Sequence, residues 1–141
     1  MHGLQKYFDF ISDDIVQAAV SLSGGGARAA AGSCGAFSGG LMALSTKFSP
    51  RSEELSAKER EELDRARIKF YEFRDWFIAE FSGVTCRDVQ CRLYGRFFNL
   101  MDNEERQAFR NFREVHGNRC SQVTMKTALK VAEILSREDN P

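Results

Sequence analysis

The stretch Ser56–Phe81, SAKEREELDRARIKFYEFRDWFIAEF, decides the fold of this chain. Ser56 and Glu59 form the Ser-x-x-Glu pattern of a capping box, which predicts that a helix begins at Ala57. Behind this cap, apolar residues recur at spacings of three and four to the end of the stretch, and Gly83 is the expected stop. The predicted apolar stripe of this long helix, the spine of the molecule, consists of Leu63, Ala66, Phe70, Phe73, Phe77 and Phe81, widened by Tyr71 and Ile78.

Helical periodicity continues along nearly the whole sequence, and no segment alternates convincingly as a strand would. Only two prolines occur, Pro50 and Pro141, and the glycine run Gly24–Gly26 separates two helical segments. We therefore predict an all-α fold, a bundle of about six or seven helices, in a single domain over residues 1–141. Besides the long helix, the expected helices cover residues 4–10, 13–22, 33–48, 86–93, 103–115 and 121–137.

Charge and composition argue against several classes of function. The chain has 141 residues with 20 basic and 20 acidic side chains, so its formal charge is zero. This balance argues against a protein that binds nucleic acid, whose surface would be net basic. No run of about 18 apolar residues is present, which argues against a membrane partner, and the first residues lack the pattern of a signal peptide. We therefore expect a cytoplasmic protein.

The cysteines carry most of the functional information. In a reducing cytoplasm, four cysteines indicate metal or redox chemistry more than structural disulfides. Three of them, Cys34, Cys86 and Cys120, lie where a helix is expected to begin. A helix N-terminus presents unpaired N–H groups and the positive end of the dipole, which favour a thiolate over a thiol. We predict that these three converge on one site and that Cys91 lies outside it; the alternative is that the cysteines are buried packing residues.

An unusual face of small residues follows Cys34. Gly35, Gly39 and Ala43 recur every four residues, with Ala36 and Gly40 beside them. Because glycine inside a helix costs about 1 kcal/mol relative to alanine, such a stripe indicates that another backbone or a cofactor approaches closely. We expect the stripe to pack against another helix, within the chain or across a homodimer.

Common catalytic and cofactor motifs are missing from the sequence. It contains no Gly-x-Ser-x-Gly, no Walker loop, no His-Glu-x-x-His and no dinucleotide fingerprint. The absence of Cys-x-x-Cys-His excludes a covalent c-type haem, and the absence of Cys-x-x-Cys argues against a thioredoxin-like dithiol.

Several segments, taken in order, resemble a known family. They are SGGGARAAAGSCGAFSGGLMALS at residues 23–45, TCRDVQ at 85–90, LYGRFFNL at 93–100 and NRCSQV at 118–123. The chain resembles, from about Ile15 to Leu135, the putative redox-active family named for its cysteine pattern, C-GCAxxG-C-C. The resemblance implies a small helical protein that performs redox chemistry, or that binds a metal or iron–sulfur centre for electron transfer with an unknown redox partner.

Only some of the family's motif residues are present in this sequence. The resemblance makes Cys34 the motif cysteine, Cys86 and Cys120 the two later ones, and Gly39 or Gly40 the motif glycine. The sequence departs from the pattern because Cys34 is followed by Gly35 and Ala36, where the family's name has Gly-Cys-Ala, and because Ser121 stands in place of the usual proline. The family's first cysteine is also missing, since none precedes Cys34. Either the chain begins further upstream or this protein lacks one thiol.

Three hypotheses follow for the function. In the first, Cys34, Cys86 and Cys120 hold a metal ion or iron–sulfur cluster, with Cys91 or His116 as the fourth ligand, because clusters usually take four thiolates and zinc also accepts three thiolates and a histidine. In the second, two thiols cycle between dithiol and disulfide without a cofactor. In the third, the chain is a non-redox helical protein with a structural or interaction role.

Overall fold

The computed structural model describes residues 1–51 and 54–137. Over these residues the chain forms seven α-helices and no strand, which confirms the predicted all-α class. No helix in this part of the chain is both long and apolar enough to cross a membrane. The helices are α1 (His2–Gln5), α2 (Asp13–Val20), α3 (Gly35–Phe48), α4 (Ala57–Phe81), α5 (Cys86–Tyr94), α6 (Asn103–His116) and α7 (Arg119–Ser136).

Capping side chains set the start of the long helix as the sequence predicts. The Ser56 hydroxyl accepts a hydrogen bond from the Glu59 N–H at 3.2 Å, and the Glu59 carboxylate accepts one from the Ser56 N–H at 2.9 Å. The end of α4 differs from the prediction, because Ser82 and not Gly83 takes the left-handed conformation, with φ of 66°. Gly83 is required for another reason: a Cβ there would lie 2.5 Å from the Asp88 carboxylate that caps α5.

The first helix is shorter than predicted. The sequence favours a helix over residues 4–10, whereas α1 ends at Gln5 and the chain then turns. So short a helix has little intrinsic stability, and the burial of its side chains determines the path of the backbone. The turn allows Leu4 and Ile11 to enter the same core cluster.

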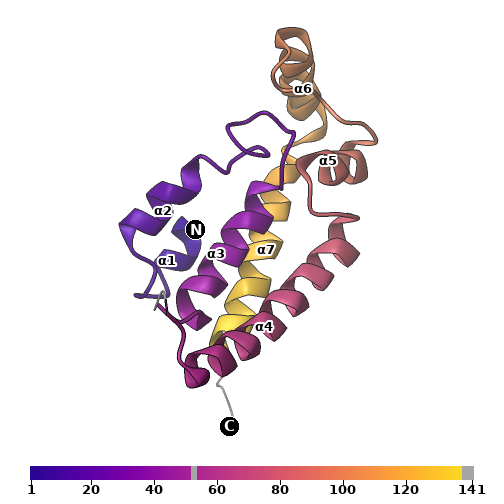
Figure 1. Cartoon of the computed structure of the whole chain (residues 1–141). Coiled ribbons are helices and arrows are strands. Elements are labelled where there is room, and N and C mark those ends of the chain that lie inside the picture. The colour runs from indigo at the N-terminus through magenta and orange to yellow at the C-terminus, as the bar shows by residue number, and fades with distance from the viewer. Residues whose placement is uncertain (52–53, 138–141) are drawn as a thin grey trace.

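Three long helices form the centre of the molecule, as Figure 1 shows for α3, α4 and α7. α3 packs against both of the others. The rings of Phe73 and Phe77 on α4 are fully buried and contact Phe37 on α3, with centroids 5.6 and 5.1 Å away. On one side, the buried face of α4 is narrower than the apolar stripe that the sequence predicts, because Tyr71 is 57% exposed.

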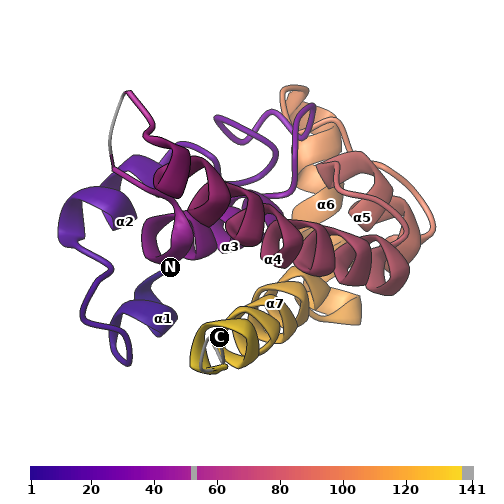
Figure 2. The ribbon, with the colours of Figure 1, turned by 60° about the horizontal axis from the view of Figure 1, so that its bottom comes forward.

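The remaining helices surround this centre. α1 and α2 cover one side of it, where α2 contacts α3 and α1 contacts α7 (Figure 2). α5 and α6 lie together at one end (Figure 1). A second cluster of buried aromatic rings, formed by Tyr94, Phe98 and Phe109, holds α5, α6 and the segment between them together.

One glycine of α3 permits the close approach of its neighbours. A Cβ at Gly40 would lie 2.5 Å from Cζ of Phe73 and 3.2 Å from Cγ2 of Val131, so a side chain here would push α4 and α7 away. At Gly39 a Cβ would meet only the Met1 side chain, at an ordinary 3.6 Å. The sequence predicts that the stripe containing Gly39 contacts another helix. In the structure it is Gly40 that makes the close helix contact.

We predict opposite effects for alanine at these two positions. Gly40→Ala should lower the free energy of unfolding by about 1–3 kcal/mol, because the added methyl overpacks the contact with Phe73. Gly39→Ala is the matched control: it gains helix propensity without a clash, and its stability should be equal or higher by up to about 1 kcal/mol. Urea denaturation of the two variants measures both values. Equal destabilisation at the two positions would contradict this account of the packing.

Candidate functional site

Three of the four cysteines line one cavity of about 340 Å³. Cys34 is the residue before α3, Cys86 is the first residue of α5, and Cys120 lies in the first turn of α7. The structure therefore brings together the three cysteines that the sequence singles out. Cys91 is exposed and is not among the residues that line the cavity.

Two backbone hydrogen bonds tie the segments of Cys34 and Cys86 together. The Cys34 N–H donates to the Val84 carbonyl at 2.8 Å, and the Cys86 N–H donates to the Gly32 carbonyl at 2.9 Å. These bonds flank an antiparallel bridge between Ser33 and Thr85. Because side chains alternate along extended backbone, the two cysteines leave the bridge on the same face, opposite to Ser33 and Thr85.

The glycine-rich loop packs directly against Cys86. At Gly25, φ is +81° and a Cβ would lie 2.8 Å from the Cβ of Cys86, so only glycine fits. The loop also folds tightly on itself. Backbone hydrogen bonds run from the Ala27, Ala30 and Gly32 N–H groups to the carbonyls of Ser21, Gly24 and Gly25.

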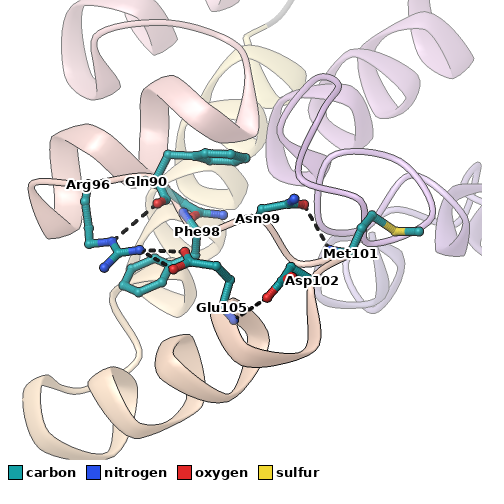
Figure 3. A network of polar contacts seen from close by, with 8 residues as sticks. Gln90, Arg96, Phe98, Asn99, Met101, Asp102 and Glu105 are labelled. Carbon is teal, nitrogen blue, oxygen red and sulfur yellow. Dashed lines mark hydrogen bonds and ion pairs between the residues drawn. The ribbon is translucent and has the colours of Figure 1, made fainter.

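A buried glutamine connects Cys86 to the aromatic cluster. The Gln90 side-chain amide donates to the Cys86 sulfur at 3.6 Å, while its carbonyl oxygen accepts from the Phe98 N–H at 2.9 Å (Figure 3). Gln90 is only 1% exposed, and both ends of its side-chain amide are hydrogen-bonded. The Arg96 guanidinium lies over the Phe98 ring, 4.4 Å from the centroid, and pairs with Glu105 of α6 (Figure 3). These contacts fix the segment that orients Gln90.

A tyrosine plays the corresponding part for Cys120. The Tyr94 hydroxyl donates to the Cys120 sulfur at 3.4 Å and accepts from the Cys120 N–H at 3.2 Å. Burial, followed by the hydrogen bond to Cys120, raises the pKa of Tyr94 to about 12. The sequence analysis does not identify Gln90 or Tyr94, although both fall within the family-like segments; the signal for Gln90 is an amide four residues after a cysteine, on the same helix face.

Burial raises the pKa of two of the cavity cysteines above its ordinary value. It raises the pKa of Cys34 more than the N–H groups of Ala36 and Phe37 lower it, and Cys120 raises it further. Burial, with smaller contributions from Cys34 and Cys120, raises the pKa of Cys86 to about 11. At Cys34 and Cys86 the effect of the helix N-terminus, which favours the thiolate, is therefore outweighed by desolvation.

The donor set does not fit a metal centre as it stands. Among residues 1–51 and 54–137, no group of three or more His, Cys, Asp or Glu side chains is arranged to hold a metal ion. The two candidates for a fourth ligand lie elsewhere: Cys91 is exposed on α5, and the exposed His116 contacts the Phe112 ring with centroids 4.2 Å apart.

Fold and site together define a small helical protein with its thiols gathered around one cavity. The family comparison agrees with this description. Residues 1–134 match the family described as "Putative redox-active protein (C_GCAxxG_C_C)", and the chain belongs to this family. Neither a curated protein nor a solved structure matches the chain.

The raised pKa of Cys86 predicts a loss of stability in alkali. The unfolded thiol ionises near pH 9, whereas the folded thiol stays protonated up to about pH 11. The folded state therefore binds more protons between these values, and its stability falls as pH rises, by about 1–2 kcal/mol from this group. Urea denaturation below pH 9 and near pH 11 measures the loss. Cys86→Ala should reduce it and the control Cys91→Ala should not; an unchanged loss in Cys86→Ala would contradict the assignment.

Proposed function

We propose that this protein is a cofactor-free thiol redox protein, in which cavity cysteines cycle between dithiol and disulfide. The observation that supports it most is that Cys34, Cys86 and Cys120, from three separate segments, line one cavity. The thiols are close enough for the pKa of Cys86 to be raised by both of the others. Membership of a family described as redox-active agrees with this role.

The chemistry is thiol–disulfide exchange. The thiolate of one cavity cysteine attacks an external disulfide, forms a mixed disulfide and releases one external thiol. A second cavity thiol then attacks the mixed disulfide, closes the internal disulfide and releases the other external thiol. Two electrons and two protons pass from the protein to the substrate. We take Cys34 and Cys86 as the favoured pair, because the hydrogen bonds of the 32–34 and 84–86 segments join their backbones and leave the two cysteines diagonal to one another across the bridge, on one face.

A metal or iron–sulfur centre for electron transfer is the second candidate. It is favoured by the same gathering of three thiols at one cavity. It requires these thiols to ionise and to move into a tighter arrangement, since the described residues form no metal-binding group. A cluster with four thiolates would also need a ligand from outside the cavity.

Mild oxidation tests the proposal directly. Protein purified anaerobically and then treated with diamide should form an internal disulfide between Cys34 and Cys86, identified by peptide mass spectrometry. Cys34→Ser should abolish this disulfide, because the favoured pair is lost, and the matched control Cys91→Ser should leave it unchanged.

The same anaerobic samples distinguish the other candidates. Iron or zinc near one equivalent per chain, lost in Cys34→Ser but kept in Cys91→Ser, would replace the thiol proposal with the metal candidate. Protein that contains no metal and forms no internal disulfide would contradict both, and would leave a structural role for the cysteines.

A further inference from the structure

Cys120 differs from the other two cavity thiols in what surrounds its sulfur. It lies in the first turn of α7 and is half-buried, whereas Cys86 is buried. Two hydrogen bonds join this turn to the end of α5. The Arg119 guanidinium donates to the Leu93 carbonyl at 2.6 Å, and the Cys120 N–H donates to the Tyr94 hydroxyl at 3.2 Å. The first turn of α7 is therefore held directly against the Tyr94 side chain.

The Tyr94 hydroxyl makes both of its hydrogen bonds to Cys120. Besides accepting from the N–H group, it donates to the sulfur at 3.4 Å. Its ring is only 8% exposed and meets the rings of Phe98, Phe109 and Phe112 edge to face, with centroids 6.4, 5.6 and 5.5 Å away. Because this packing fixes the ring, the hydroxyl is already aimed at the sulfur before any reaction. A donor held in this way favours the thiolate over the thiol.

A cation lies close to this pair. Arg113 of α6 lies over the Phe109 ring, 5.4 Å from the centroid, and its Nε atom is buried without a hydrogen-bond partner in the part of the chain that the structure describes. Burial and the hydrogen bond to Cys120 raise the pKa of Tyr94, and the Arg113 charge acts in the opposite direction. Arg113 is therefore near enough to favour negative charge on the sulfur that Tyr94 contacts.

Burial dominates at the other two cavity thiols. It raises the pKa of Cys34, and it raises the pKa of Cys86 to about 11. Two further ionisable groups line the cavity, His2 and the amino group of Met1, and neither is hydrogen-bonded to a sulfur among the described residues. Cys120 is therefore the cavity thiol whose surroundings best support an attacking thiolate.

We propose that Cys120 attacks the external disulfide, with Tyr94 as its positioning residue, and that the disulfide then passes to Cys34 and Cys86. This inference rests on the proposed thiol exchange and assigns the order in which the three cysteines react. It also gives the third thiol a use in a reaction whose final product contains only two.

Each step is an exchange at one sulfur. The Cys120 thiolate attacks the external disulfide, forms a mixed disulfide and displaces one external thiol. Cys34 then attacks the Cys120 sulfur, closes a Cys34–Cys120 disulfide and displaces the second external thiol. Cys86 attacks the Cys34 sulfur and displaces Cys120 as a thiolate, which leaves the Cys34–Cys86 disulfide. The external disulfide gains two electrons, and the protons of Cys34 and Cys86 leave on the external thiols.

The surroundings of Cys120 also set the direction of the last step. In thiol exchange the sulfur that is more stable as a thiolate leaves faster. The Tyr94 hydroxyl and the Arg113 charge support the Cys120 thiolate, so Cys120 is the favoured leaving group when Cys86 attacks. The bridge between the 32–34 and 84–86 segments then keeps the final pair on one face.

Serine variants in a Cys91→Ser background test the order of attack. The probe is 2,2′-dithiodipyridine, a neutral disulfide that releases a coloured thione when a thiol attacks it. Cys120→Ser should slow the first release about tenfold or more, because burial disfavours the two thiolates that remain. Cys34→Ser and Cys86→Ser should change the first rate by less than about twofold. Cys86→Ser should stop at a Cys34–Cys120 disulfide, identified by peptide mass spectrometry.

A pH profile tests the role of Tyr94. Tyr94→Phe keeps the ring and removes the hydroxyl, so the midpoint of the first release should move to higher pH by about one unit, while the rate at high pH changes little. Tyr71→Phe, at an exposed position of α4, is the matched control and should move neither. Arg113→Met should move the midpoint in the same direction, and it provides the test if Tyr94→Phe does not fold.

The outcomes separate this inference from the proposed function. A first release that Cys34→Ser slows and Cys120→Ser does not would overturn the order of attack, as would a Cys86→Ser product other than the Cys34–Cys120 disulfide, while thiol exchange stands. Midpoints in Tyr94→Phe and Arg113→Met that match Tyr71→Phe would contradict the role of Tyr94. If the folded Cys91→Ser protein releases no thione and the urea-unfolded chain does, the proposed function itself fails.

Discussion

The site depends on a pair of backbone hydrogen bonds, from Cys34 to Val84 and from Cys86 to Gly32. They join two segments about fifty residues apart at the points where α3 and α5 begin. The close contact of Gly25 with Cys86 reinforces this junction, and the capping pair of Thr85 and Asp88 fixes the start of α5. α7 completes the site, because its packing against α3 brings Cys120 to the same cavity.

Burial and helix dipoles oppose one another at these cysteines. A helix N-terminus favours a thiolate, but its influence is confined to the first turn and is worth about 1 kcal/mol. Removal of the sulfur from water favours the thiol more strongly, and neighbouring sulfurs act in the same direction. The thiols of Cys34 and Cys86 thus hold their protons more strongly in the folded protein than in water.

The sequence predicts the fold well wherever the signal is local. The capping pair at Ser56 places the start of α4, and the spacing of Phe73 and Phe77 identifies the buried face of that helix. The errors lie where tertiary contacts decide. α1 ends at Gln5, earlier than predicted, because the chain turns to bury its side chains in the core. Glycine is required at position 83 because the Asp88 side chain packs against it.

The candidate site also divides into features with a local sequence signal and features that depend on tertiary contacts. The gathering of the cysteines could be predicted because their helix starts and the family pattern are visible in the sequence. Gln90 and Tyr94 could not be assigned roles, because each role depends on a contact that forms only in the folded chain. The same limit explains why the stripe of small residues did not distinguish Gly39 from Gly40.

The proximity of the cavity thiols is the central claim, and a short thiol-bridging reagent tests it most directly. Dibromobimane becomes fluorescent when it has joined two thiols, and the Cys91→Ser variant leaves only the cavity cysteines to react. The account predicts an intramolecular bridge between two of Cys34, Cys86 and Cys120, mapped by peptide mass spectrometry, in the monomeric folded protein. Single alkylation at each cysteine without any bridge would contradict it.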